Sequence, residues 1–468
     1  MSSSCFYRLG IGVALALSFT TALSAEVRFV AQPPLAVVTP QSMISADMNE
    51  DGLPDIVVAS VVGHVVSVLL NDGSGSLLAP ATFPAGTSPY HLCTADFDED
   101  GHADVAVANL VGGTLQVLLG TGTGALGAPT SFPTGSLSTA ITCADFNEDQ
   151  HQDLVVANHG GASLTLLFGD GGGNFGASVY LTLGGFPSFV THGDLDGDGH
   201  LDLAVSRSLD SNFSLFFGDG SGAFPLSSTH FLGQDDAIWF LSTSDVDGNG
   251  SDDLLIPCPN ANSVAVFLGL GNGLLAPPAP FATGVYPRAA DVQDFDGDGR
   301  SDLGIVNGGG GSVSVLLGDG GGSFAAPVNF LSGPEGAHVI CADLNLDGRL
   351  DLVVGQTAAS QLRVLINEST PPNPQPFRRG DVDASGTVQI VDVIVLLHGL
   401  FHFAAPAWGC ADAVDVNDDG HINLLDPVAL LSHLFGNGYV SLPTPSAGAC
   451  DHDPTIDALS DCRPGLCP

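Results

Sequence analysis

Apolar residues along the chain gather in short runs separated by polar turns, and the whole arrangement recurs about every 49 residues. In the second repeat, residues 90–97, 104–109 and 114–119 have the composition of three β-strands. A glycine-rich turn at residues 120–124 follows, and a fourth strand ends at Phe132. Four short antiparallel strands repeated about seven times predict a β-propeller.

The two ends of the repeat region complement each other. After its acidic loop the seventh repeat has strands only at residues 352–355 and 361–366, and the chain then becomes proline-rich. Residues 27–37 precede the first loop and resemble the fourth strand of the other repeats. We therefore expect the N-terminal strand to complete the last blade of an all-β, seven-bladed propeller formed by residues 26–367.

Each repeat carries an acidic loop between its first and second strands. The loop that starts at Asp194 has aspartates at positions 1, 3, 5 and 9 and a glycine, Gly199, at position 6. Oxygens at alternate positions of a tight loop converge, and Ca²⁺ takes roughly six to eight such oxygens. The glycine allows positive φ. An EF-hand loop closes at position 12 and enters a helix, whereas this loop closes at position 9 and enters a strand.

Seven copies of the loop in register favour metal binding over acidic surface turns, so the sequence predicts up to seven Ca²⁺ ions with a structural role. In two loops, Gln150 replaces the glycine and Asn249 replaces a carboxylate, and these two sites are expected to be the weakest. The predicted ligands are Asp47, Asn49, Asp51 and Asp55; Asp96, Asp98, Asp100 and Asp104; Asp145, Asn147, Asp149 and Asp153; Asp194, Asp196, Asp198 and Asp202; Asp245, Asp247, Asn249 and Asp253; Asp294, Asp296, Asp298 and Asp302; and Asp343, Asn345, Asp347 and Asp351.

The repeat is similar to the FG-GAP or VCBS repeats that form the N-terminal propeller of integrin α-subunits. Besides the acidic loops, the Phe-Gly and Gly-x-x-Pro elements of that family are present in degenerate form, for instance at Phe168-Gly169 and from Gly284 to Pro287. The resemblance covers about residues 26–368. It implies a calcium-binding propeller that acts in binding or cell adhesion.

Residues 1–25 have the features of a secretory signal peptide. Arg8 supplies the charge, residues 9–19 the apolar core, and residues 22–25 the small-residue cleavage region, with the cut after Ser24 or Ala25. The sequence therefore predicts a secreted or cell-surface protein. No other stretch is long and apolar enough for a transmembrane helix. The 51 acidic residues against 10 basic ones exclude a nucleic-acid binder that relies on phosphate contacts.

A second calcium motif follows a proline-rich linker at residues 368–379. Two loops with the 12-residue EF-hand spacing each run into a helix-like segment, which resembles a type I dockerin over residues 380–439. The resemblance implies up to two further Ca²⁺ ions and a cohesin-like partner, although Ile390-Val391 and Leu424-Leu425 stand where dockerins often present polar partner-reading residues. The ligands expected there are Asp381, Asp383, Ser385 and Asp392, and Asp415, Asn417, Asp419 and Asp426.

The cysteines fall into two groups. Cys93, Cys143 and Cys341 lie on predicted buried strands and act as small core residues. Cys410, Cys450, Cys462 and Cys467 lie in or shortly before a loop-rich tail, residues 440–468, of a chain expected to be exported, so disulfides are expected among them. Four cysteines allow three pairings, and the sequence leaves all three open.

The face of the propeller opposite the acidic loops is the candidate ligand face. We expect a non-catalytic scaffold that binds an extracellular protein or polysaccharide there, with the dockerin-like module as its anchor. The alternative is a polysaccharide-degrading enzyme, a glycoside hydrolase or lyase, or an accessory subunit, for which Asp235 and Asp236 would be paired carboxylates. No nucleophile–base pair recurs beside the loops. The candidate ligand-binding residues are His91, Asp235, Asp236, Trp239, Tyr286, Arg288 and His338.

Overall fold

The computed structural model describes residues 27–208, 211–232 and 236–369. The predicted signal peptide, most of the linker, the dockerin-like module with its eight expected ligands, and the tail lie outside these residues, as does Asp235. In the described part of the chain, no helix has the length and apolar character needed to cross a membrane.

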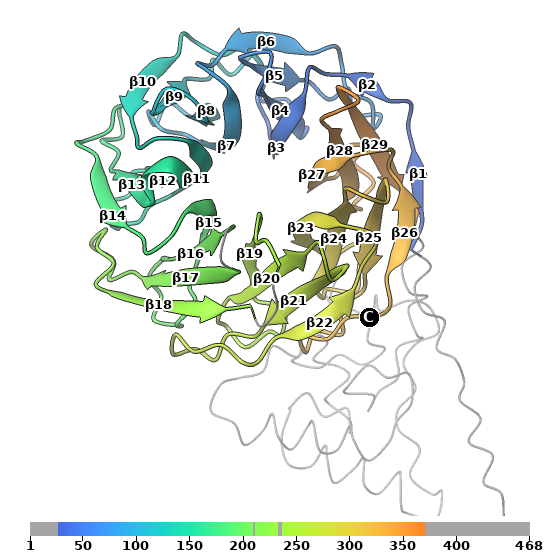
Figure 1. Cartoon of the computed structure of the whole chain (residues 1–468). Helices are drawn as coiled ribbons and strands as arrows, with labels where there is room; N and C mark the ends of the chain where they lie inside the picture. The colour runs from blue at the N-terminus through green and yellow to red at the C-terminus, as the bar shows by residue number, and fades with distance from the viewer. Residues whose placement is uncertain (1–26, 209–210, 233–235, 370–468) are drawn as a thin grey trace, which may run out of the picture. The chain divides into compact units, whose positions relative to one another are not determined.

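The described residues form seven antiparallel sheets arranged around a central axis (Figure 1). The prediction of an all-β, seven-bladed propeller is confirmed, and one 3₁₀ turn, η1 (His159–Gly161), is the sole helical element of the described residues. We number the sheets as blades in chain order. Blade 1 consists of β3 (Pro40–Ala46), β4 (Asp55–Ser60), β5 (Val65–Leu69) and β6 (Ala81–Pro84), and blade 2 of β7 (Pro89–Ala95), β8 (Asp104–Asn109), β9 (Thr114–Leu118) and β10 (Thr130–Pro133).

The next four blades repeat this order. Blade 3 consists of β11 (Ser138–Ala144), β12 (Asp153–Asn158), β13 (Ser163–Leu167) and β14 (Val179–Thr182), and blade 4 of β15 (Pro187–Gly193), β16 (Asp202–Arg207), β17 (Asn212–Phe217) and β18 (Leu226–Phe231). Blade 5 consists of β19 (Ser242–Ser244), β20 (Asp253–Cys258), β21 (Ser263–Phe267) and β22 (Ala279–Ala282), and blade 6 of β23 (Pro287–Gln293), β24 (Asp302–Asn307), β25 (Ser312–Leu316) and β26 (Val328–Leu331).

Blade 7 combines the two ends of the propeller segment. Its strands β27 (Gly336–Ala342), β28 (Asp351–Gln356) and β29 (Gln361–Asn367) are followed at the outer edge by β1 (Phe29–Ala31) and β2 (Leu35–Ala36), both paired antiparallel with β29. The register places Phe29 opposite Asn367 and Leu35 opposite Leu362.

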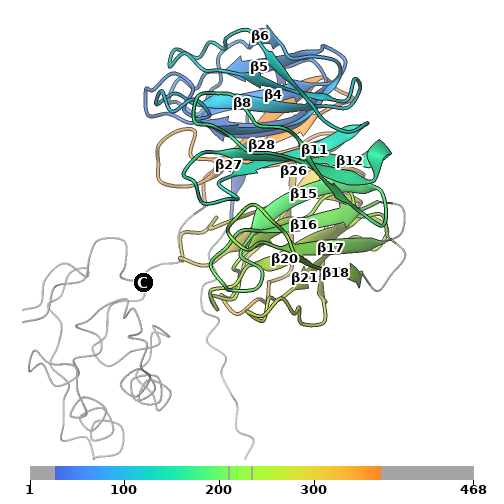
Figure 2. The same cartoon turned by 90° about the vertical axis from the view of Figure 1, so that its left-hand side faces the viewer.

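The second strand of every blade is buried along its whole length. All six residues of β4, β8, β12, β16, β20, β24 and β28 are buried because a neighbouring blade covers each face of the sheet (Figure 2). Burial on both faces explains why these strands read as continuous apolar runs rather than as alternating ones. The hydrophobic core therefore lies between blades, as in the cluster that joins Val57 and Val66 of blade 1 to Leu92 and Val105 of blade 2.

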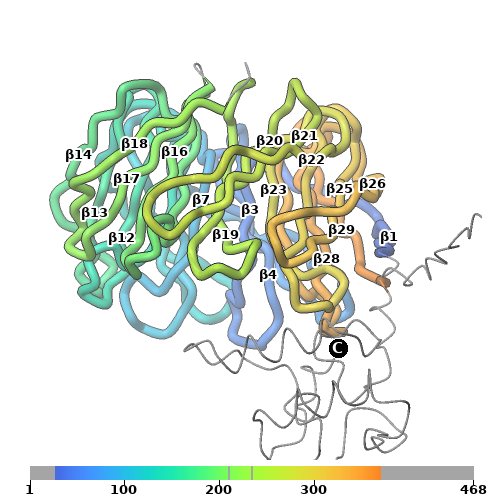
Figure 3. The backbone as a smooth tube through the Cα atoms, turned by 90° about the horizontal axis from the view of Figure 1, so that it is seen from below, coloured from blue at the N-terminus to red at the C-terminus, as the bar shows by residue number. Residues whose placement is uncertain are grey.

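The antiparallel order sorts the connections onto two opposite faces. Turns between first and second strands and between third and fourth strands lie on one face, which we call the loop face because it carries the acidic loops. Turns between second and third strands and the connections between blades lie on the other, which we call the pocket face. Figure 3 shows turns gathered at the two opposite faces of the ring.

Candidate calcium loops and a candidate binding pocket

The acidic loops are held in shape by their own side chains. In all seven loops the carboxylate at position 1 accepts the backbone N–H of position 6 at 2.8–3.0 Å. The side-chain oxygen at position 5 accepts the N–H of position 7 at 2.8–3.0 Å. These bonds fold the backbone into one tight loop.

The aspartate at position 9 is a buried structural group in every loop. One of its oxygens accepts the N–H of position 2 at 2.8–3.0 Å. The other accepts, at 2.6–2.9 Å, the N–H of the residue 16 positions further on, at or just beyond the end of the third strand. The closing aspartate therefore ties together three segments of its own blade. The spacing alone predicts only a ligand at this position.

Burial makes ionisation of the closing aspartates costly in the absence of a cation. Desolvation raises the pKa of Asp104, Asp153, Asp253 and Asp351 to about 6, and neighbouring carboxylates add to the effect. The pKa of Asp202 rises to about 7 for the same reasons. A bound divalent cation would offset this cost, because it favours the charged form.

Four loops bring three carboxylates close enough to share one ion. In each of them, oxygens of positions 1, 3 and 9 lie within 4.8 Å of one another. The Oδ1 atom of Asp98, at position 3, is buried and has no hydrogen-bond partner in the described residues. Hard carboxylate oxygens with an unmet acceptor fit Ca²⁺. The four sets are Asp96, Asp98 and Asp104; Asp194, Asp196 and Asp202; Asp245, Asp247 and Asp253; and Asp294, Asp296 and Asp302.

The other three loops have asparagine at position 3. Asn49, Asn147 and Asn345 each donate from their amide nitrogen to the position-5 aspartate of the same loop, at 2.9–3.2 Å. Their amide oxygens remain suitable calcium ligands. Asn249, which stands at position 5 of the fifth loop, instead donates to the carbonyl of Gly269 at 2.9 Å.

Six of the acidic loops also accept a hydrogen bond from the next blade through a backbone carbonyl. The carbonyl oxygens of Met48 and Phe97, at position 2 of their loops, accept the N–H groups of Gly124 and Gly173 from the following blades at 2.7 and 2.9 Å. An ion held in the loop would therefore stabilise the junction between blades as well as one turn.

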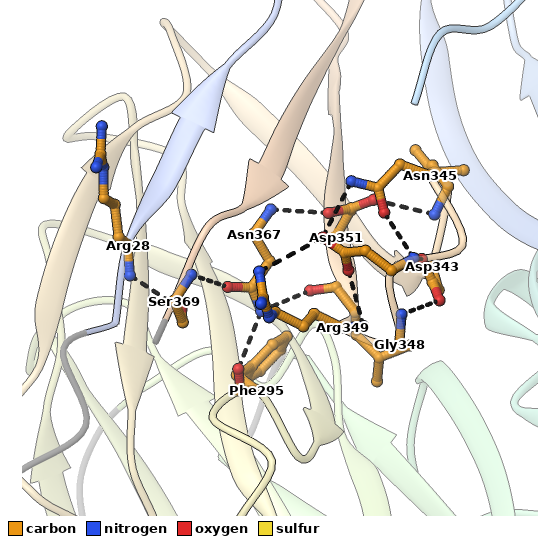
Figure 4. A network of polar contacts seen from close by, with 12 residues as sticks. Arg28, Phe295, Asp343, Asn345, Gly348, Arg349, Asp351, Asn367 and Ser369 are labelled. Atoms are coloured by element: carbon orange, nitrogen blue, oxygen red, sulfur yellow. Dashed lines mark hydrogen bonds and ion pairs between the residues drawn. The ribbon is translucent and has the colours of Figure 1, made fainter. Parts of the chain in front are cut away.

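The junction at blade 7 reaches the N-terminal strand (Figure 4). Asn367 donates its backbone N–H to Asp351 at 2.7 Å and its side-chain amide to the carbonyl of Phe295 in blade 6 at 2.9 Å. Its side-chain oxygen accepts the N–H of Ser369 at 2.9 Å, and the Ser369 hydroxyl accepts the N–H of Arg28 at 3.0 Å. A continuous polar network thus joins the seventh acidic loop to the start of the described chain.

Gln150 adopts the strained conformation expected from its place in the third loop, with a φ of 76°. Replacing it by glycine (Gln150→Gly) is expected to stabilise the protein by about 1 kcal/mol, because positive φ costs a side-chain-bearing residue about that much. Thermal unfolding would measure the change. The reverse substitution, Gly199→Gln, is the matched control, since a Cβ at Gly199 would meet no atom within 4 Å. A loss at Gly199 without a gain at Gln150 would contradict the strain argument.

Position 4 of the loop also has positive φ, which the sequence motif did not reveal. Glu50, Glu99 and Glu148 occupy this position with φ of 56–60°. Each contacts, through its carboxylate, the Nδ1 atom of a histidine at position 7 of the next loop: His102, His151 and His200 respectively. The hydrogen bond to glutamate raises the pKa of all three histidines.

Removing one of these glutamates is expected to change the pKa of one histidine. In Glu99→Gln, the pKa of His151 should fall toward its ordinary value of about 6.5, while that of His200 should stay raised. Because the folded-state pKa is raised, the pair stabilises the fold fully below the ordinary value and loses this contribution as the pH rises through the raised one. Histidine ring NMR in saturating calcium would measure both values. If the pKa of His151 did not change in Glu99→Gln, the contact between the two side chains would not form in solution.

The pocket face has a central cavity of about 400 Å³ at the mouth of the propeller channel. Six of the first strands carry a register shift at their second residue, which turns that side chain into the cavity. The six residues are Gln41, Tyr90, Thr139, Ser188, Arg288 and Ala337. Each stands six positions before the first aspartate of its loop, and Trp239 has the same position in blade 5.

Aromatic rings and imidazoles line this pocket. Phe189 contacts Phe240 with ring centroids 4.4 Å apart and His91 at 4.9 Å, and His338 lies 6.2 Å from His91. Burial lowers the pKa of His91 to about 4 and that of His338 to about 3, so both imidazoles are neutral at pH 7. The Nδ1 atom of His338 is buried without a hydrogen-bond partner among the described residues.

Five of the seven candidate ligand-binding residues meet at this pocket: His91, Trp239, Tyr286, Arg288 and His338. Asp236 lies elsewhere. It is buried, and its carboxylate accepts the backbone N–H groups of Asn260 and Ala261 at 3.0–3.2 Å. Gln41, Thr139 and Ser188 were not singled out from the sequence, although their fixed distance from the acidic loops is a signal that marks them.

The two faces differ sharply in charge. All seven acidic loops, and the turn residues Asp72, Asp170, Asp219 and Asp319, are on the loop face. Among the described residues of the pocket-face turns, the acids are Glu335 and the buried Asp236. The large exposed apolar side chains of these turns include Val62, Val111, Leu137, Phe186, Trp239, Val285 and Tyr286, and Leu331 is exposed at the adjoining end of β26.

Comparison with protein families identifies the repeat. The FG-GAP-like repeat matches six overlapping segments, residues 47–107, 96–156, 145–205, 194–256, 245–305 and 294–354, which together span most of the propeller and include all seven acidic loops. The chain belongs to the FG-GAP-like repeat family. No curated protein matches its sequence.

Solved structures share the fold at low sequence identity. The N-terminal part of BBS1, solved in complex with ARL6 after soaking with mercury, is 12% identical with a TM-score of 0.54, and 72% of this chain aligns with 96% of that one. The lead-soaked form of the same complex gives 13% identity, a TM-score of 0.52 and the same coverage. A protein from Lactobacillus plantarum is 18% identical with a TM-score of 0.50, over 64% of this chain and 87% of that one.

Proposed function

We propose that the chain is an exported, calcium-stabilised binding scaffold, with the acidic loops as its metal sites and the pocket face as its binding surface. The observation that carries this proposal is the difference between the two faces. Clustered carboxylates lie on the loop face, and an aromatic pocket within apolar turns lies on the pocket face. Contiguous exposed apolar surface marks interaction sites. The partner is an extracellular protein or polysaccharide.

Calcium would act in the propeller as a structural ion. Positions 1, 3, 5 and 9 of each loop would hold it, up to seven ions in all. Because the loops join their own turns and the next blade, bound ions would rigidify the ring that positions the pocket. Residues 380–439 are proposed to add a dockerin-like anchor with up to two ions, and residues 1–25 to direct export.

A propeller of this shape can serve protein recognition, as the complex of BBS1 with ARL6 illustrates for that protein. The enzymatic alternative receives no support from the described residues. Asp236 is committed to backbone N–H groups and is not among the residues that line the pocket, so it does not provide a reactive carboxylate there.

Site-specific photocrosslinking in the organism that makes the protein would test the binding face. A photoreactive amino acid at Val111, which is 49% exposed on the pocket face, is expected to capture a macromolecule. The matched control is Leu274, which is 57% exposed in a loop-face turn and should give no adduct. Adducts from Leu274 alone, or recovery of the chain only inside the cell, would refute the proposal.

A further inference from the structure

The pocket face also exposes aliphatic side chains from several blades. Val62 is 70% exposed in blade 1, Val285 is 57% exposed between blades 5 and 6, and Leu331 is 80% exposed at the end of β26. An apolar rim of this kind excludes water from a central contact in protein–protein interfaces. It offers little to a sugar polymer, whose hydroxyl groups would lose water without finding polar partners.

The centre of the same face holds the residue types that dominate binding energy at protein interfaces, namely tryptophan, tyrosine and arginine. Trp239 is 50% exposed and Tyr286 is 38% exposed, so both rings are available to a partner. The cavity of about 400 Å³ behind them has the volume of a pocket that receives one or two side chains.

Arg288 gives this centre its charge. Among the residues that line the pocket it is the one arginine, and no lysine, aspartate or glutamate accompanies it; burial lowers the pKa of the His91 and His338 imidazoles. In the described part of the chain, no carboxylate lies within 4.0 Å of its guanidinium. A cation with no ion-pair partner among the described residues, in a protein of net charge −41, is an attractive site for an anionic group.

The arginine side chain contacts two neighbouring segments. Its guanidinium carbon lies 5.8 Å from the centre of the Tyr286 ring, which it overlies. Its stem runs along the backbone of Gly308, where an added Cβ would fall 2.8 Å from the Arg288 Cδ atom. A planar guanidinium suits bidentate recognition of a carboxylate.

We propose that the pocket face binds a protein whose contact surface is apolar and carries one protruding aspartate or glutamate, and that this carboxylate enters the pocket and pairs with Arg288. The inference rests on the proposed function, because it names the partner chemistry of the same face. The partner's apolar side chains would cover the rim, and the buried Nδ1 of His338 offers a further polar contact in the pocket.

The test uses the full chain as bait for a displayed library of random nine-residue peptides. We expect selected peptides to share one aspartate or glutamate between apolar residues. The selection should fail with Arg288→Gln as bait and succeed with Arg28→Gln, which removes an exposed arginine that pairs with Glu368 away from the pocket. Arg288→Lys should retain part of the selectivity, since it keeps the charge.

Tryptophan fluorescence then measures affinity. The chain has two tryptophans, so Trp408→Phe leaves Trp239 as the reporter in the pocket. The best peptide should bind at least about tenfold more tightly than its glutamine counterpart, and Arg288→Gln should abolish that difference. Melting curves of each variant confirm that it is folded.

Four results would overturn the inference: no enriched peptide, enrichment of lysine or arginine in the aromatic pocket, acidic preference that survives Arg288→Gln, or Arg288-dependent binding to acidic sugars on a glycan array. Each leaves the photocrosslinking result at Val111 intact. The partner chemistry and the proposed binding face can therefore fail separately.

Discussion

Removing calcium from the full chain is expected to lower its melting temperature by about 15 °C. A ligand that binds only the folded state stabilises it by about 2.7 kcal/mol per site at a concentration 100-fold above its Kd. The four loops with three clustered carboxylates would then contribute roughly 11 kcal/mol. For a domain of roughly 340 residues, the entropy of unfolding is about 0.7 kcal/mol per degree, which gives the expected shift.

Differential scanning fluorimetry in excess chelator, followed by stepwise addition of calcium, measures this shift. Magnesium is the control ion, because it demands a smaller octahedral site and releases its water reluctantly. It should restore little of the stability. A melting curve that does not respond to calcium would show that the loops hold their shape through their internal hydrogen bonds alone.

The second large effect is expected at the closing aspartates. Asp202→Ala would leave the buried N–H group of Leu195 and the partly buried N–H group of Gly218 without an acceptor. An unsatisfied buried donor costs about 1–3 kcal/mol, so the free energy of unfolding should fall by about 2–6 kcal/mol even in chelator. Calcium affinity of that loop should fall as well, because the same carboxylate lies in the cluster.

Asp198→Ala in the same loop is the matched comparison. Asp198 is exposed, and its side chain accepts the N–H of His200 within the loop. This substitution should weaken calcium binding while changing the stability in chelator by no more than about 1 kcal/mol. Chemical denaturation of both variants, with and without calcium, separates the roles. Equal losses in chelator would mean that position 9 is only a ligand.

Much of the fold was predictable because its signals are local. The hydrogen bonds that shape the acidic loop join residues only a few positions apart, so the spacing of its aspartates in the sequence is enough to predict the turn. The buried second strands are also visible as apolar runs. The pairs from Glu50, Glu99 and Glu148 to histidines 52 residues later recur regularly in the sequence, yet they gain meaning only once successive loops are known to be neighbours.

The remaining features depend on contacts that sequence spacing does not show. The role of Asp202 comes from an N–H group 16 residues away that the hairpin returns to the loop. The pocket depends on a register shift that turns residues such as Arg288 inward. Asp236 looked reactive beside Asp235, but its place in a turn lets three backbone N–H groups occupy its carboxylate. The dockerin-like module and the signal peptide remain predictions from the sequence.

The unequal charge of the two faces gives the propeller an electrical direction. With the carboxylates on one side, the ring behaves as a dipole whose negative end is the loop face. Close to an anionic cell envelope or an acidic polymer, repulsion acting within about 8 Å at physiological salt would turn that end away. The pocket face, which has few carboxylates, then leads the approach, so the molecule arrives already oriented for capture.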